Sequence, residues 1–69
     1  MNETVKIWLE NLVNREIDEV LGTISNSKIW LLGSSDKEAI QAQLDNLFLH
    51  DEYLTALKIL KNRIEREDL

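Results

Sequence analysis

The chain has 69 residues and a mass of 8.1 kDa, which is enough for one domain and no more. It contains no Cys and a single His, which excludes disulfides, thiolate metal sites and a zinc site built from several His side chains. Thirteen acidic and eight basic residues give a net charge of −5, whereas proteins that bind nucleic acid normally carry a basic field.

The first half of the chain has the pattern of one long helix. Pro is absent and there are only two Gly, so few residues interrupt a helix. We predict a helix over about residues 4–32, with Asn2 or Thr4 as its cap and with Trp8 and Leu21 at the edges of its apolar face. Apolar residues recur mostly in steps of three and four, the spacing of one helical face, at Val5, Leu9, Leu12, Val13, Ile17, Val20, Ile24 and Leu31.

Gly22 and the polar residues after it are the weak point of this helix. Glycine inside a helix costs about 1 kcal/mol relative to Ala. We therefore expect Gly22 to permit a close helix–helix contact or a bend. Because Thr23–Ser27 is poor helix-forming sequence, a break at 22–28 is the alternative.

The clearest boundary is Gly33-Ser34-Ser35-Asp36. Gly33 suits the left-handed position that follows a helix end. Ser35 with Glu38 three residues later forms the pattern of a capping box. The sequence therefore predicts a tight turn at 33–35 and a new helix from residue 36.

The second half shows apolar residues on two different helical faces. At 100° per residue, the earlier group centres about half a turn away from the later group, and the change falls at residues 49–52. We favour one continuous helix over about 36–66. The alternative is a break there, with Asp51 capping a third helix. The two groups are Ile40, Leu44, Leu47 and Phe48, and then Tyr53, Leu54, Leu57, Leu60 and Ile64.

These elements predict an all-α fold, a long antiparallel hairpin that forms a single domain over residues 1–69. Two helices cover only one seam of each other, so we expect assembly into a helical bundle, with a homodimer favoured. A three-helix monomer is the alternative.

No residue pattern points to catalysis or to a cofactor. His50 has no nucleophile or base partner at helical spacing, so we interpret it as a surface or interface residue. Glu16, Asp18 and Glu19 form an acidic cluster that we interpret as a solvated face rather than a metal site. We expect a protein that is not an enzyme and needs no cofactor or metal.

The chain has no signal-peptide core and no apolar run of the roughly 20 residues that span a membrane. We therefore expect a cytoplasmic protein without a membrane partner. Since the chain begins at Met1, we expect it to be the complete product.

The two Trp are the strongest interaction signal in a chain with four aromatic residues. Both can pack inside a bundle, but the run Ile29-Trp30-Leu31-Leu32 cannot face one seam in full, so part of it must point outward. Exposed apolar residues and Trp are typical of binding surfaces. The candidate protein-interaction residues are Trp8, Ile29, Trp30, Leu32, Phe48 and Tyr53.

Two short patterns carry a resemblance over about residues 16–60: Asn26-x-x-x-Trp30-x-x-Gly33, and Asp45-Asn46 followed after six residues by Tyr53-Leu54-x-x-Leu57. In these the chain resembles small, largely uncharacterised helical proteins of phages and prophages of Gram-positive bacteria. The resemblance implies a bacterial cytoplasm and a role in phage biology, for which binding and modulating a host protein is the expected mode.

The function expected from these observations is a small non-enzymatic protein-interaction module, with a protein partner that the sequence does not identify. The alternative is a role connected with nucleic acid. In one form the acidic surface mimics nucleic acid. In the other, the basic helix end binds it weakly through Lys58, Lys61, Arg63 and Arg66, although the overall charge opposes this form.

Overall fold

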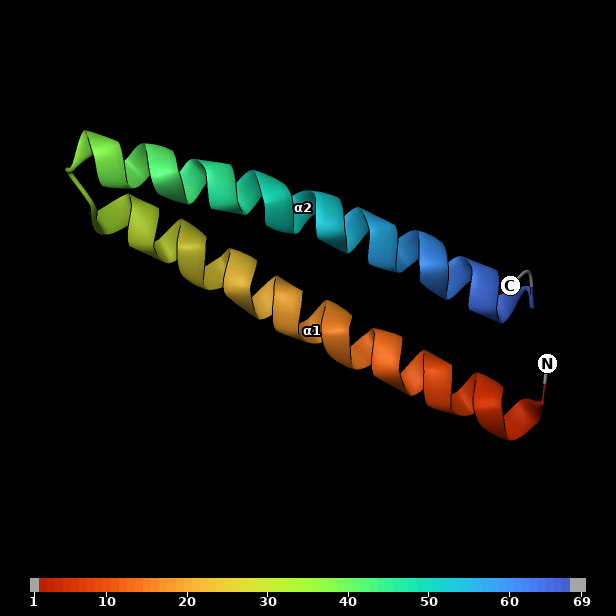
Figure 1. Cartoon of the computed structure of the whole chain (residues 1–69). Coiled ribbons are helices and arrows are strands. Elements are labelled where there is room, and N and C mark those ends of the chain that lie inside the picture. Colours follow the sequence, from red (N-terminus) through yellow and green to blue (C-terminus); the bar gives the residue numbers. More distant parts are fainter. Residues whose placement is uncertain (1, 68–69) are drawn as a thin grey trace.

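The computed structural model describes residues 2–67 and consists of two antiparallel helices (Figure 1). Helix α1 spans Glu3–Gly33 and helix α2 spans Lys37–Glu65, and no strand occurs in this range. The hairpin is a rod of 51 × 15 × 11 Å, with the turn at one end and both termini at the other. The predicted all-α hairpin is thus confirmed, and each helix end lies within one residue of its predicted position.

Helix α1 is continuous, so the alternative break at 22–28 is wrong. Asn2 caps it by accepting hydrogen bonds from the backbone N–H groups of Thr4 at 2.8 Å and Val5 at 3.4 Å. Gly22 is exposed, and a Cβ added there would meet no atom within 4 Å. Gly22 therefore makes no close contact with α2, contrary to that prediction, because it lies on the side of α1 that faces away from the seam.

The turn differs from the prediction in two details. Asp36, not Ser35, caps α2, and its carboxylate accepts from the N–H groups of Glu38 at 3.1 Å and Ala39 at 3.4 Å. A carboxylate suits this position better because its charge also interacts with the positive end of the helix dipole. Gly33 does not adopt a left-handed conformation, since α1 ends through Ser34 in extended geometry.

Helix α2 runs through residues 49–52 without interruption, as favoured. Asp51 is an internal helical residue whose carbonyl accepts from the Thr55 hydroxyl at 3.1 Å, so it caps no third helix. One seam follows the whole helix in alternating steps of three and four, the heptad spacing of a coiled coil. Along this seam the buried or half-buried positions are Ile40, Gln43, Leu47, His50, Leu54, Leu57, Lys61 and Ile64, and Ala39 beside Ile40 is also half-buried.

The core lies along this single seam between the helices. Val20 and Ile24 of α1 pack with Leu54 and Leu57 of α2, and Ile17 and Leu47 pack against that cluster. Ile64 is the most deeply buried side chain, at 1 % exposed. Each helix therefore buries one narrow stripe and leaves the rest of its surface open.

Neither described helix combines the length and the apolar character that a membrane crossing requires.

Candidate protein-interaction surfaces

The hairpin exposes more large apolar side chains than it buries. Among the described residues, six hydrophobic side chains form the core and fourteen large ones remain exposed. Single exposed apolar residues are ordinary in soluble proteins, but contiguous groups of them mark binding surfaces.

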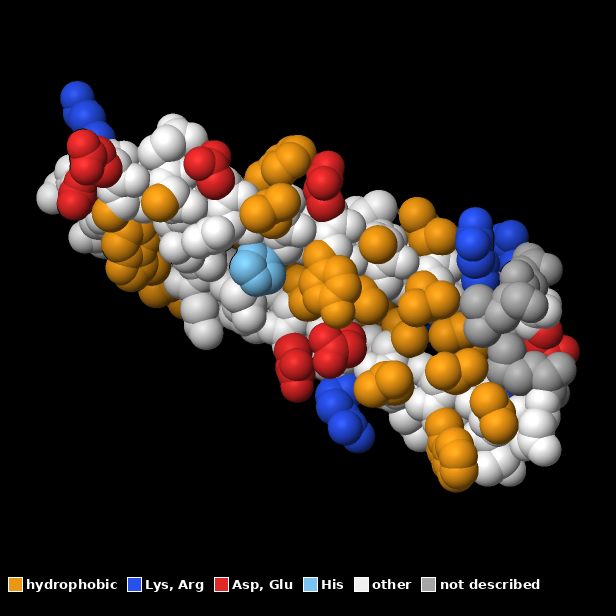
Figure 2. Space-filling model, in the orientation of Figure 1, with side chains coloured by type: hydrophobic (Ala, Val, Ile, Leu, Met, Phe, Trp, Pro, Cys, Tyr) orange, Lys and Arg blue, Asp and Glu red, His pale blue; other side chains and the backbone are white. Residues whose placement is uncertain are grey.

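One group lies near the two chain termini and is called the open-end patch. On α1 it consists of Val5, Trp8 and Leu12, and on α2 of Tyr53 and Leu60, all of them exposed. The α1 residues follow one another in steps of three and four, so they share one side of the helix. Figure 2 shows hydrophobic side chains gathered over both helices on this half of the molecule.

A hydrogen bond places the two halves of the open-end patch on the same side. The Tyr53 hydroxyl donates to Glu16 Oε2 at 3.3 Å. Glu16 lies one turn after Leu12, on the same side of α1, so the α1 stripe and the Tyr53 side of α2 meet there. The open-end patch is therefore one surface built from both helices, with the Glu16 and Glu19 carboxylates at its inner end.

This contact also changes the ionisation of Tyr53. Partial burial and then the nearby negative charge of Glu16 raise the pKa of the phenol above its ordinary value of 10.0. The bond to Glu16 and the charge of Glu19 act in the same direction. The neutral phenol is the form that can donate this hydrogen bond to Glu16.

A second group lies at the turn. Ile29, Trp30 and Leu32, called the tip residues, are 68, 45 and 88 % exposed, whereas Leu31 turns toward the seam and is half-buried. This confirms that the apolar run cannot face one seam. The tip residues point in different directions around the end of α1, so they form a knob rather than a flat face.

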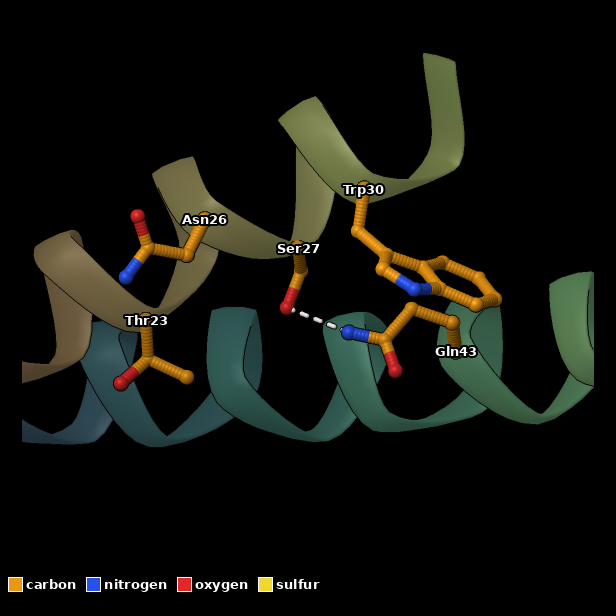
Figure 3. Close-up of a pocket in the computed structure, with 5 residues that line it drawn as sticks. All are labelled: Thr23, Asn26, Ser27, Trp30 and Gln43. Carbon is orange, nitrogen blue, oxygen red and sulfur yellow. Dashed lines mark hydrogen bonds between the residues drawn. The ribbon is translucent and has the colours of Figure 1, made fainter. Parts of the chain in front are cut away.

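A shallow hollow of about 330 Å³ lies beside Trp30 (Figure 3). Its floor is a polar contact between the helices, in which Gln43 Nε2 donates to Ser27 Oγ at 2.7 Å. Thr23 and Asn26 lie along its other end, and the Trp30 ring points toward Gln43. The hollow combines an aromatic wall with amide and hydroxyl groups.

The opposite flank of α2 carries a smaller group. Leu44 and Phe48 are exposed there, about a third of a turn or more away from Tyr53 around the helix. The positions that follow at helical spacing are Asp51 and Thr55, so this stripe is interrupted by polar residues. It is the natural comparison for tests of the open-end patch.

All six candidate interaction residues from the sequence are exposed, but the hairpin does not bring them together. Trp8 and Trp30 are 22 residues apart on one helix, which separates them by about 33 Å at 1.5 Å per residue. Val5, Leu12 and Leu60 belong to the open-end patch, yet sequence reasoning assigned them to apolar faces expected to pack. The spacing of Val5, Trp8 and Leu12 was the signal that could have identified this stripe.

The remaining polar candidates form no metal site in the described part of the chain. No group of three or more His, Cys, Asp or Glu within residues 2–67 is arranged to bind a metal ion. Half-buried His50 donates from Nδ1 to the Asn46 carbonyl at 2.7 Å. Among the basic residues of α2, Lys61 is half-buried in the seam, whereas Lys58 and Arg63 are exposed and lie about 140° apart around the helix.

Comparisons with protein-family models, with curated proteins and with solved structures found no match for this chain. The resemblance to phage proteins therefore stays a prediction.

Proposed function

We propose that the chain is a non-enzymatic protein-interaction module of the bacterial cytoplasm. It pairs with a second copy and presents its tip residues to another protein. The observation that supports this most directly is the fourteen exposed large apolar side chains against six buried ones. A hairpin with one seam has too little core to stand alone, and binding to protein removes the surplus apolar surface from water.

The tip residues are the proposed contact with the other protein. Leu32 is almost fully exposed and Trp30 stands at the edge of a hollow that a partner side chain can enter. Trp is frequent among the residues that dominate binding energy. The phage resemblance supports a host protein as this partner, with modulation of that protein as the outcome.

The test compares proteins captured from a Gram-positive bacterial lysate by the wild type and by a Trp30→Ala, Leu32→Ala variant. Ile59→Ala is the matched control, since Ile59 is 51 % exposed and lies on α2 away from the tip. We expect a stoichiometric partner that the wild type and Ile59→Ala retain and the tip variant loses, with unchanged helicity. Equal capture by all three proteins would contradict the proposal.

A further inference from the structure

The accessible surface of the chain is larger than its mass predicts. It measures 5261 Å², whereas a folded monomeric protein of 8.1 kDa exposes about 4500 Å². The difference is about 800 Å², which is close to what each partner buries in an interface of standard size. One further copy of the chain therefore accounts for the surplus.

The open-end patch is a better site for that copy than the opposite flank of α2, because its stripes are longer than the stripe of Leu44 and Phe48. On α1 the stripe runs from Val5 through Trp8 and Leu12 to Glu16 and Glu19 in steps of three and four. On α2 a matching stripe with the same steps contains Leu49, Tyr53, Ala56, Leu60 and Arg63. Each stripe is about 21 Å long, and this spacing is the one by which helices interdigitate. The opposite flank is interrupted after Phe48.

The order of residues along the stripes decides how the copies are oriented. If the turns pointed in opposite directions, α1 would lie on α1 of the other copy, and Val5 and Trp8 would cover Glu19 and Glu16. Two carboxylates would then be buried under apolar side chains without partners, which is costly. If the turns point the same way, α1 of each copy lies on α2 of the other, at the same height.

This second arrangement matches the apolar part of the two stripes. It places Glu16 and Glu19 beside Tyr53 and Leu49 of the other copy, where the Tyr53 hydroxyl can donate to a carboxylate. Leu12 then meets Ala56 and Leu60 of the other copy, and Trp8 meets Leu60 and Arg63, a cation that packs well on an indole face. Every helix also has antiparallel neighbours, as in four-helix bundles of simple up-and-down topology.

We infer that two copies pack through their open-end patches, with both turns at the same end and α1 of each copy on α2 of the other. This rests on the proposed function in so far as that function includes pairing with a second copy. All four chain ends then lie at one end of the bundle, and the tip residues of both copies lie together at the other.

Disulfide cross-linking tests the orientation cleanly because the natural chain has no Cys. Leu12→Cys and Leu60→Cys variants are mixed, allowed to exchange subunits and oxidised. We expect a mixed Leu12–Leu60 dimer to be the main product, at least tenfold over a Leu12–Leu12 dimer. A dominant Leu12–Leu12 product would overturn the inference, since it requires turns at opposite ends. Cross-linking of Phe48→Cys to itself would also overturn it.

Charge substitutions test the face independently. We expect Trp8→Glu with Leu12→Glu to raise the dissociation constant of the dimer at least tenfold. We expect the matched Leu44→Glu, Phe48→Glu variant to leave it within about twofold. If the Leu44, Phe48 variant alone dissociates, this inference fails while pairing of copies, and so the proposed function, survives. If the wild type is a monomer, pairing itself fails, whereas capture of a partner by the tip residues is unaffected.

Discussion

At the scale of single residues, Tyr53 is the side chain whose chemistry reports most directly on the hairpin. Its hydroxyl bonds to Glu16 across the two helices, and its raised pKa means that the folded state holds the proton more firmly than the unfolded chain. Such a group stabilises the fold fully below the unfolded pKa, and this contribution is lost as the pH rises through the folded pKa.

We therefore expect the wild type to lose stability above pH 10.0, the ordinary value for Tyr. Glu16→Gln should move the Tyr53 pKa back toward that value, because it removes the neighbouring charge. The chain has one Tyr, so the absorbance of tyrosinate during a pH titration measures this group alone. Tyr53→Phe is the control for Lys titration in the same range, and an unshifted midpoint in Glu16→Gln would contradict the assigned cause.

At the scale of elements, α1 contains one residue, Gly22, whose low helix propensity destabilises the helix. Gly22 is exposed, has no positive φ and has open space where a Cβ would stand. Gly22→Ala should therefore stabilise the hairpin by about 1 kcal/mol, from helix propensity alone. Gly33→Ala, at the last residue of α1, should gain less. Denaturant unfolding of both variants measures the difference. A loss of stability in Gly22→Ala would show that another chain packs closely against this glycine.

The elements also show how far the sequence could predict the fold. The apolar residues from Val5 to Leu31 recur with the period of one helical face, so the first helix was predictable. The second helix seemed to change face because its exposed apolar residues lie on opposite sides of the seam, Leu44 and Phe48 on one side and Tyr53 and Leu60 on the other. Ser35 and Asp36 are both good caps, and only the path of the turn decides between them.

At the scale of the whole molecule, the number of helices decides which apolar residues are core and which are surface. Leu12 and Leu60 have the spacing of core positions, and in a bundle of more helices they would be core. In a single hairpin they are 52 and 37 % exposed, because the partner helix covers one stripe only. The sequence could therefore identify apolar faces. Only the position of the seam shows which apolar residues stay exposed and form the open-end patch.

The exposed apolar surface is also the surface that the proposed assembly would cover. The chain is a rod with one seam, and its surface is about 800 Å² larger than its mass predicts. We propose that such a rod is half of a bundle. Its stability should depend on concentration, because association and folding are linked.

The most direct test is the absolute mass in solution, measured by light scattering behind a sizing column across a dilution series. Pairing of two copies predicts twice the 8.1 kDa of the chain at high concentration, with a fall toward a single chain only on strong dilution. A mass of one chain at every concentration, with full helicity and sharp unfolding, would contradict it.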